Sequence, residues 1–592
     1  MKKILFAVSS LGLGHASRTL PLIKAYLAKD YHITIVSHAK ALAFLQEELK
    51  DKKVTFIDLE DYPRLERGTG LAYYYYLLID LLATYRIIKK EHSFLKDKDF
   101  DLIISDGRYG FYSKFTPCFL ISHQIAFVIP KIFLLFKPVI DLGNLIYFKK
   151  FWEVFIPDFA SKNNSLAGRL AHNYLLQFFK HSFVGILSAY GPEKNAKQIN
   201  YLFVISGYLE EHKDSFVNKL IEQAKGLAGK KVFILGDPSQ KEVIFLERDI
   251  TIYPVATSAL RKKLFAGAKL IISRTGYTTL MDLVEMDKKA VLFPTPNQTE
   301  QEYLARYHQK KGWFVVHLDD KNFDLNKLIQ RVGQSKTFPA RQKTKATLSK
   351  IEKIIADYTK ENFFSLIIPA FNEEKYLEKT LTKLKNLNYE RYEVIVVENG
   401  STDQTLAIAH QHKNQKIKVL QSPKGVSLAK NKGIEQISKQ SDYTIFLDAD
   451  TILEKDFLRE LNCFLNRNKD KRMVVGTTSI LPYTPHSSKD LFWYKFYDYV
   501  HRFTHSSYSL QIAKSCLLKR IKFDPELNFS EDLKFIREMK QYGNFFFFQT
   551  NKVFTSPRRF RQEGYLKTTI KWFIQAILPD FVKKNKSYRP IR

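Results

Sequence analysis

Cysteine, acidic residues and long apolar runs are all scarce in this 592-residue sequence. The three cysteines, Cys118, Cys463 and Cys516, match no disulfide framework or zinc motif, which fits a reducing compartment. Because no charge-free apolar run reaches about 18 residues, we expect no membrane-spanning helix. An apolar strand is predicted to begin within the first few residues, so we also expect no secretory signal peptide.

The most apolar stretch, residues 125–148, is interrupted by two prolines, two lysines and an aspartate. Such a segment either lies at a membrane interface or forms a buried helical lid, and both interpretations stay open.

Acidic side chains are outnumbered, since 93 Lys and Arg residues face 61 Asp and Glu residues and the formal net charge is +32. A charge of this size favours polyanionic partners: nucleic acid, an anionic membrane surface or phosphorylated substrates. No nucleic-acid-binding motif occurs and the basic residues are spread along the chain, so we expect no nucleic acid partner. A basic nucleic-acid-binding protein remains the alternative from a different functional class.

The order of apolar strands and helical stretches predicts an α/β chain of several domains. Short buried strands alternate with amphipathic helices up to about residue 355, and a fresh α/β pattern begins at residue 363. We therefore predict an N-terminal pair of doubly wound, Rossmann-like domains and a separate C-terminal α/β domain. The predicted boundaries are 1–200 and 201–340 for the pair, 341–362 for a helical linker, 363–560 for the C-terminal domain and 561–592 for a basic aromatic helix and tail.

Three motifs in the C-terminal half place polar side chains directly after predicted strands. They are SLIIPAFNEE at 365–374, VIVVENGSTDQT at 394–405 and IFLDADT at 445–451. Open α/β sheets bind ligands at the carboxyl ends of their strands. The single residue between Asp448 and Asp450 lets both carboxylates approach one divalent cation that bridges a diphosphate, so we expect an Mg²⁺ or Mn²⁺ site.

These motifs resemble those of the family 2 glycosyltransferases, which have the GT-A fold. The resemblance covers about residues 363–560 and implies a nucleotide-sugar donor, a divalent cation and inversion at the anomeric carbon. It implies the donor-binding residues Pro369, Phe371, Glu373, Glu398, Asn399, Asp403 and Lys430. The chain departs from the family pattern where Glu398 and Asn399 replace two aspartates and Lys430 replaces an arginine, which loses the bidentate fork.

A general base is required, because the acceptor hydroxyl loses its proton as it attacks. The segment FSEDLKFIREMKQYG at 529–543 resembles the acidic segment that opens a helix in family 2, which implies Asp532 as the base with Glu531 beside it.

Basic residues dominate the end of the sequence. Arg558 and Arg559 can hold a donor diphosphate or a lipid phosphate, or they belong to a solvated basic face. Lys567, Lys571 and Trp572 follow on a predicted helix and indicate contact with a membrane surface.

Two segments of the N-terminal half resemble family 28 glycosyltransferases of the GT-B fold, which include the enzymes that add N-acetylglucosamine to the peptidoglycan lipid intermediate. The first, IISRTGYTTLMDLVEM at 271–286, is a strand, a short turn and a helix N-terminus, a geometry that binds phosphate. The second is VLFPTPNQTEQEYLARYHQKKG at 291–312. The resemblance covers about residues 1–350 and implies the donor-binding residues Arg274, Thr275, Gly276, Asp282, Glu300 and Gln301, with Glu300 standing where the lipid-intermediate enzymes have glutamine.

The loop SSLGLGHASR at 9–18 follows the first predicted strand and is expected on the acceptor side of the cleft. Gly12 and Gly14 allow a ligand to approach the backbone there, and we expect them, with Arg108, to contact the acceptor or a phosphate. His15 is the first candidate for the catalytic group, and His123 and Asp106 are alternatives as the base. By the resemblance, this head needs no metal ion.

The function predicted from these motifs is a bifunctional inverting glycosyltransferase with two catalytic heads. Its expected partners are nucleotide-sugar donors, a glycan or polyprenyl-phosphate-linked acceptor of the cell envelope, and an anionic membrane surface. The expected location is cytoplasmic, peripheral at the inner face of the cell membrane. The alternative within enzymology is a nucleotide-sugar 2-epimerase, which shares the GT-B architecture, fused to a family 2 glycosyltransferase.

Overall fold

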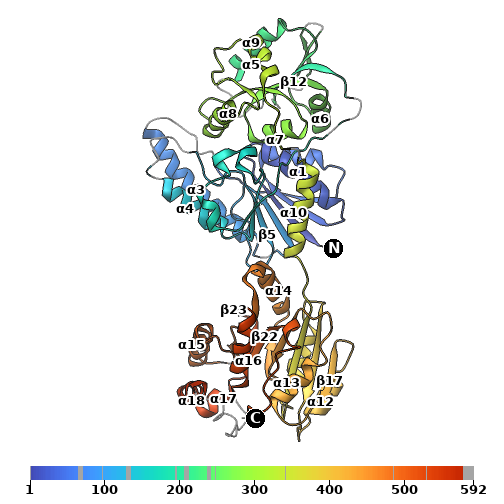
Figure 1. Cartoon of the computed structure of the whole chain (residues 1–592), viewed down its shortest axis with the longest axis vertical. Helices are drawn as coiled ribbons and strands as arrows, with labels where there is room; N and C mark the ends of the chain where they lie inside the picture. Colours follow the sequence, from blue (N-terminus) through green and yellow to red (C-terminus); the bar gives the residue numbers. More distant parts are fainter. Residues whose placement is uncertain are drawn as a thin grey trace. The chain divides into compact units, whose positions relative to one another are not determined.

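The computed structural model describes residues 2–63, 71–96, 98–128, 135, 137–191, 193, 196–205, 213–236, 242–246, 249–340, 342–483, 486–527 and 530–577. Of residues 71–78, 213 and 575–577 it describes the backbone alone. The chain divides into two compact units, Met1–Ala356 and Asp357–Arg592 (Figure 1).

The first sheet of unit 1 is parallel, with the strand order β3-β2-β1-β4-β5-β6-β7. Its strands are β1 (Lys3–Val8), β2 (His32–Ser37), β3 (Val54–Asp58), β4 (Leu102–Asp106), β5 (Cys118–Ile121), β6 (Glu153–Ile156) and β7 (His181–Phe183). Its helices are α1 (Leu13–Leu27), α2 (Ala39–Glu48), α3 (Leu71–Phe94) and α4 (Lys137–Phe148). The strand order reverses between β1 and β4, and α/β proteins bind ligands beyond the carboxyl ends at such a point.

The second sheet of unit 1 has the order β10-β11-β9-β8-β12-β13-β14 and is parallel except for the β10–β11 pair. Its strands are β8 (Ile199–Val204), β9 (Lys231–Ile234), β10 (Ile244–Leu246), β11 (Ile250–Tyr253), β12 (Ala268–Arg274), β13 (Ala290–Phe293) and β14 (Val315–Val316). Its helices are α5 (Lys213–Lys225), α6 (Ser258–Gly267), α7 (Tyr277–Glu285), α8 (Thr299–Lys311) and α9 (Leu325–Arg331). The predicted boundary at residue 201 would cut β8, so the second domain begins no later than Ile199.

The predicted linker at 341–362 is a helix for most of its length, α10 (Thr344–Tyr358), but it is not a free connector. Lys350 Nζ donates to the carbonyl of Phe183 at 2.7 Å, and Glu352 pairs with Lys29 at 3.0 Å. Helix α10 therefore packs back on the first domain, and the first unit extends to Ala356.

Unit 2 contains a mixed sheet with the order β17-β16-β15-β18-β22-β20-β23 and a small sheet, β19-β24-β21. The strands are β15 (Phe364–Ala370), β16 (Tyr392–Glu398), β17 (Ile417–Gln421), β18 (Tyr443–Leu447), β19 (Thr451–Leu453), β20 (Met473–Thr478), β21 (Leu481–Pro482), β22 (Leu510–Lys514), β23 (Asn544–Phe548) and β24 (Val553–Thr555). The helices are α11 (Leu377–Lys385), α12 (Thr405–Gln411), α13 (Val426–Ile434), α14 (Phe457–Arg467), α15 (Ser488–Thr504), α16 (Glu531–Met539), α17 (Arg558–Glu563) and α18 (Tyr565–Ile577). The three motif-bearing strands, β15, β16 and β18, are neighbours, so their carboxyl ends meet at one edge.

Within the described residues, no helix combines the length and the apolar character that crossing a bilayer requires. Residues 129–134 and 136 of the apolar stretch lie outside the described residues. The described helix α4 lies at the surface, with Val139 68% exposed and Phe148 buried. Of the two interpretations of this stretch, α4 does not support the buried lid, and the interfacial one stays a prediction.

Candidate active sites

The loop between β1 and α1 faces helix α7 of the second domain. Gly12 has φ +140°, a conformation that requires glycine. Gly14 has a different role from the predicted one, because a Cβ there would lie 2.7 Å from Thr278 Oγ1 on α7. The glycine at position 14 thus permits close packing of α1 on α7, and this packing rather than a ligand explains it.

Asp106, at the end of β4, collects the polar side chains that follow this loop. Its fully buried carboxylate accepts hydrogen bonds from His15 Nδ1, Arg18 Nε and Thr19 Oγ1, each at 2.7 Å, and from Arg18 Nη2. Burial by itself would raise the pKa of Asp106, but Arg18 and His15 outweigh it and hold the pKa well below its ordinary value. Asp106 is therefore an ionised acceptor that orients its neighbours.

The hydrogen bond to Asp106 decides which nitrogen of His15 carries the proton. An ionised carboxylate only accepts, so Nδ1 is protonated and Nε2 keeps its lone pair. Arg18 Nη2 lies 3.0 Å from Nδ1, but both groups are donors, so this contact is a proximity and not a hydrogen bond. The side chain of His15 is 24% exposed, and within the described residues Nε2 has no hydrogen-bond partner. His15 Nε2 thus has the geometry of a general base.

His123, the second candidate base, uses both of its nitrogens. Arg18 Nη1 donates to Nδ1 at 3.0 Å, and Nε2 donates to Glu300 Oε1 at 2.8 Å. Burial lowers the pKa of His123, in agreement with a neutral ring, and the ring stacks on Tyr277 with centroids 4.0 Å apart. His123 therefore has no free lone pair and connects the two Rossmann-like domains instead.

The proposed diphosphate loop of the second domain lies at the start of α7. Gly276 is the N-cap residue of α7, and a Cβ added there meets nothing closer than Thr279 Oγ1 at 3.6 Å. The hydroxyl of Thr275 is buried and has no hydrogen-bond partner among the described residues. A buried hydroxyl without a partner beside a helix N-terminus fits an anionic ligand.

Arg274, expected at the same diphosphate, is engaged elsewhere. Its Nη1 pairs with Asp320 at 3.0 Å and donates to the carbonyl of Pro294 at 2.9 Å, and the guanidinium lies 3.8 Å from the ring centre of Phe216. Arg274 therefore stabilises the domain rather than reaching a ligand.

The three remaining donor-site candidates of this half have different surroundings. Glu300 lies where the two Rossmann-like domains meet, and it accepts from His123 and Gln124 of the first domain. Asp282 accepts from Ser188 Oγ at 2.5 Å, and burial raises its pKa to about 7. Gln301 accepts from both the amide and the hydroxyl of the nearby Thr295, at 3.0 and 2.9 Å. Glu300 is thus the best placed of the three to contact a donor sugar.

Arg108 does not occupy the predicted phosphate position. Its guanidinium is fully buried, pairs with Glu91 at 2.6 Å and donates to the carbonyls of Leu59 and Glu60 at 3.0 and 2.6 Å. A guanidinium whose donors are satisfied inside the fold supports the loop after β4 and does not contact a ligand.

In unit 2, Arg558 joins a predicted donor-binding acid and a predicted metal ligand. It forms a bidentate pair with Glu373, with contacts of 2.7 and 3.0 Å, and lies 3.2 Å from Asp450 Oδ2. The sequence places these residues far apart, but α17 brings Arg558 to the carboxyl edge of β15 and β18. Arg559, its neighbour on α17, is half-buried.

Asp448 and Asp450 suit a divalent cation. Asp448 is exposed and Asp450 is buried, where it accepts from Thr555 Oγ1 at 3.3 Å. Burial raises the pKa of Asp450 to about 7, and the charge of Asp448 adds to the effect. Two carboxylates that repel each other at the mouth of a sheet are stabilised by a cation, and Mg²⁺ needs only one or two protein carboxylates when phosphate oxygens supply the rest. Among the described residues, no cluster of three or more His, Cys, Asp or Glu side chains could hold a metal ion without such help.

The predicted base, Asp532, lies in the first turn of α16 beside Glu531. Lys430 on α13 pairs with Glu531 at 3.1 Å, so the lysine that replaces the family arginine faces the acidic pair. Burial and the charge of Glu531 raise the pKa of Asp532 to about 7, against the opposing charge of Lys430. An acid with a pKa near neutrality is suited to accept a proton from a hydroxyl.

The other predicted nucleotide contacts lie at the ends of β15 and β16. Glu398 accepts from the Ser401 amide, and its pKa is lowered because this bond and others outweigh burial. The buried Asn399 Oδ1 has no partner within the described part of the chain. Pro369 and Phe371 are half-buried at the same edge.

Asp403 differs from this group. One carboxylate oxygen accepts from the amide and hydroxyl of Thr405, at 3.0 and 2.5 Å, and the other accepts from the Glu374 amide at 3.2 Å. Asp403 therefore supports the first turn of α12, which is a structural role.

Two residues at the N-terminal cleft were missed by sequence reasoning. Arg18 lies three residues after His15 on α1, a spacing that puts both on one helix face and was the available signal. Gln124 directly follows His123 and donates to Glu300, but no spacing indicated that contact.

Comparison with known proteins matches the two halves to two families. The model of the glycosyltransferase family 28 C-terminal domain matches residues 212–358, and the model of glycosyl transferase family 2 matches residues 365–521. The first match includes α7 and α8, and the second includes β15, β16, β18 and α13.

Similar characterised sequences include a dolichyl N-acetyl-alpha-D-glucosaminyl phosphate 3-beta-D-2,3-diacetamido-2,3-dideoxy-beta-D-glucuronosyltransferase of Methanococcus voltae. It is 27% identical over 241 residues, which cover 37% of this chain and 71% of that protein. The poly(ribitol-phosphate) beta-N-acetylglucosaminyltransferase TarS of Staphylococcus aureus is 27% identical over 117 residues, or 19% of this chain and 20% of TarS.

Solved structures similar to this chain cover both halves. TarS residues 1–349 of S. aureus align with 37% of this chain and 68% of that one, at 21% identity and a TM-score of 0.28. The calicheamicin glycosyltransferase CalG4 aligns with 60% of this chain and 94% of its own length, at 16% identity and a TM-score of 0.41.

Proposed function

Because the chain joins a glycosyltransferase family 28 C-terminal domain to a family 2 glycosyltransferase domain, we propose that it is a bifunctional inverting glycosyltransferase with one catalytic head in each unit. The observation that carries the proposal for the first head is the 2.7 Å contact between His15 Nδ1 and the buried Asp106, which leaves Nε2 free. For the second head it is Lys430, which pairs with Glu531 at 3.1 Å and interacts electrostatically with Asp448 and Asp532.

In the first head, His15 Nε2 takes the proton of the acceptor hydroxyl. The hydroxyl oxygen attacks the anomeric carbon of the donor sugar, the bond from that carbon to the diphosphate oxygen breaks, and the nucleoside diphosphate leaves with the electron pair. Asp106 stabilises the imidazolium that forms. The N-terminus of α7, with Gly276 and Thr275, binds the negative charge that develops on the diphosphate.

In the second head, Asp532 is the group that takes the acceptor proton, and the bonds form and break as in the first. Asp448 and Asp450 would hold Mg²⁺ or Mn²⁺, which supplies Lewis-acid stabilisation of the leaving diphosphate. Lys430 holds Glu531 at 3.1 Å and keeps the acidic pair in place. Glu398 and Asn399 contact the nucleotide, and Arg558 exchanges a carboxylate partner for a diphosphate oxygen.

We further propose that the acceptor is a glycan or polyprenyl-phosphate-linked intermediate of the cell envelope, and that the protein acts at the inner face of the membrane. Relatives named for poly(ribitol phosphate) and dolichyl phosphate substrates support this class of acceptor. Fusion of two heads raises the effective concentration of a shared intermediate, which favours addition of two sugars in succession.

The test is a panel of nucleotide sugars, including UDP-N-acetylglucosamine, assayed for nucleotide release with three full-length proteins: the parent chain, His15→Ala and Asp450→Asn. Each variant should abolish turnover of one donor and spare the other, and only the turnover lost in Asp450→Asn should depend on a divalent cation. His15→Ala should keep its donor affinity, since the base contacts the acceptor.

Two results would contradict the proposal. Loss of both activities in either single variant would mean that the heads are not independent. The second result is conversion of a UDP-sugar to its 2-epimer in the absence of any acceptor. If His15→Ala abolished that conversion, the first unit would be identified as an epimerase instead.

A further inference from the structure

Helix α15 presents two aromatic faces, and only one of them is covered. Tyr494, Tyr497 and His501 are buried against the domain. On the opposite side, Phe492, Phe496, Tyr499 and Phe503 recur at intervals of three and four residues and are exposed. A helix of a monomeric globular domain normally directs such a stripe inward, so the outward aromatic stripe requires a partner.

Helix α18 carries a second stripe of this kind. Leu566, Ile570, Phe573 and Ile574 are exposed on one face, at positions i, i+4, i+7 and i+8. Trp572 is half-buried, and its ring packs against Tyr497 with centroids 5.6 Å apart. The outward residues of α18 are thus its aliphatic side chains and Phe573.

The two stripes adjoin. The ring of Trp493 on α15 stacks on Tyr565 of α18, and the Tyr497 hydroxyl lies 2.8 Å from Thr569 Oγ1. Because these contacts follow the same order along both helices, α15 and α18 run parallel.

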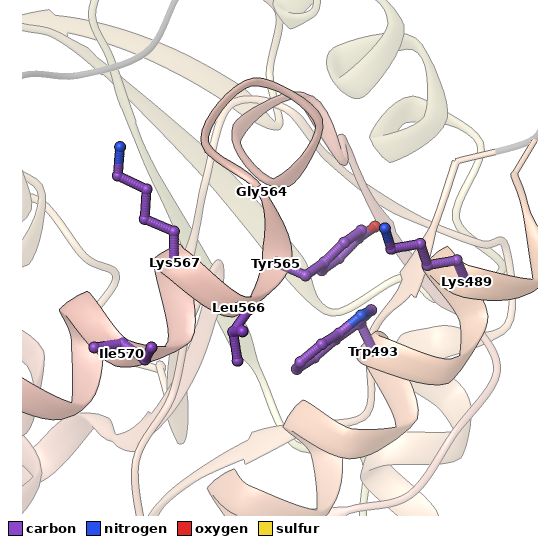
Figure 2. A pocket seen from close by; sticks show the side chains of 7 residues that line it. All are labelled: Lys489, Trp493, Gly564, Tyr565, Leu566, Lys567 and Ile570. Atoms are coloured by element: carbon purple, nitrogen blue, oxygen red, sulfur yellow. The ribbon is translucent and has the colours of Figure 1, made fainter.

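Figure 2 shows the pocket between α15 and α18. The side chains of Trp493, Leu566 and Ile570 line it, and Lys489 and Lys567 extend at its two sides. The apolar floor and the flanking ammonium groups therefore belong to one continuous surface.

Basic residues predominate on this surface; the acids nearby include Asp498 on α15, which is half-buried, and Glu563, which pairs with Lys571 at 3.0 Å. Lys489, Lys495 and Arg502 border the stripe of α15, and Lys567 and Lys571 border that of α18. Asp490, the buried acid of α15, is held by Tyr565 and by Arg561 at 3.2 Å.

We propose that α15 and α18 form a docking surface for an anionic lipid bilayer, with the aromatic and aliphatic stripes at the acyl boundary and the basic residues at the phosphodiester headgroups. Protein–protein interfaces are depleted of lysine, whereas interfacial membrane helices combine Phe, Trp and Leu on one face with Lys and Arg at its edges. An apolar stripe together with basic residues also provides the two signals that stable membrane attachment needs. The inference goes beyond sugar transfer and holds whether or not either head is active.

Co-sedimentation of the full-length protein with vesicles tests the inference. Vesicles of phosphatidylcholine alone are compared with vesicles containing equal amounts of phosphatidylcholine and phosphatidylglycerol. We expect binding to the anionic vesicles that weakens with salt. Phe503→Asp combined with Phe573→Asp should reduce that binding by about tenfold or more, because two side chains that are 75% and 69% exposed no longer enter the bilayer.

Two further variants make the test specific. Phe245→Asp is the matched control, since Phe245 is 73% exposed but lies in the other unit, and it should bind vesicles like the parent. Lys489→Gln with Lys567→Gln should lose about fivefold per lysine on anionic vesicles and nothing on neutral ones. Nucleotide release without vesicles and the thermal unfolding midpoint should be unchanged in all variants, which excludes misfolding.

The inference is overturned if the double phenylalanine variant binds anionic vesicles as tightly as the parent, or if phosphatidylglycerol makes no difference. It is also overturned if sedimentation equilibrium shows that the phenylalanine substitutions dissociate a dimer while vesicle binding persists, since the surface would then bind a second copy of the chain.

Discussion

Replacing Asp106 by asparagine should separate the two roles of the buried cluster in the first unit. The carboxylate of Asp106 is fully buried and accepts from His15, Arg18 and Thr19, and the Arg18 side chain is 2% exposed. An amide offers one acceptor oxygen and no charge. The buried guanidinium then lacks its counter-charge, which we expect to cost about 3–5 kcal/mol of unfolding free energy.

Turnover by the first head should fall for a different reason. The neutral amide cannot stabilise the imidazolium that forms when His15 accepts a proton, so we expect a loss on the order of 10²–10⁴-fold. Adding Arg18→Met to Asp106→Asn removes the unpaired charge. The double variant should therefore recover most of its stability while its turnover remains low.

Nucleotide release is measured with the donor of the first head, in proteins that also carry Asp450→Asn, which silences the second head. The unfolding of each variant is measured by calorimetry. Parent-like turnover in Asp106→Asn would refute the role of the His15–Asp106 pair. Turnover that returns together with stability in the double variant would also refute it, because misfolding would then account for the loss.

Three more outcomes follow from the geometry. Gly276→Trp should weaken donor binding by the first head more than about tenfold in calorimetric titration, because the added side chain fits the backbone there but covers the N-terminus of α7. Gly333→Trp is the control: a side chain at Gly333 also meets no close neighbour, and this variant should bind the donor normally. Gly14→Ala should lower the unfolding free energy by about 1–3 kcal/mol through overlap with Thr278 Oγ1. Adding Thr278→Ala to Gly14→Ala should restore most of this loss. Equal stability of Gly14→Ala and of the double variant would contradict the packing role. Turnover by the second head should rise with pH and reach half its maximum near pH 7. Burial and the neighbouring acid raise the pKa of Asp532 to about 7, and only its ionised form accepts a proton. A profile that is flat between pH 5 and 9, or that falls as pH rises, would argue against this base.

The α/β class and the succession of domains could be predicted because they depend on local patterns. The strands β1, β12 and β15 contain the apolar runs 4–8, 270–272 and 366–370, and a loop with glycine or asparagine follows each strand. Short edge strands such as β10 and β21 were not predicted, because three or two residues carry too little periodicity.

Side-chain partners were harder to predict, because they depend on contacts between distant segments. The basic residues Arg108, Arg274 and Arg558 look alike in sequence as phosphate ligands. All three pair with acids on other elements, but Arg108 and Arg274 are buried, whereas Arg558 is 17% exposed at the carboxyl edge of β15 and β18. The difference between these arginines is their burial, which depends on the packing of distant segments and is not visible in a short motif.

The outward aromatic stripe of α15 has a consequence for how the purified protein behaves in solution. At low ionic strength the net charge of +32 keeps molecules apart. Added salt shortens the Debye length to about 8 Å near 0.15 M, so that repulsion fades while apolar attraction persists. We therefore expect salt to release the protein from membranes and, at the same time, to promote its self-association, which makes dilute, low-salt buffer the condition in which the free protein stays dispersed.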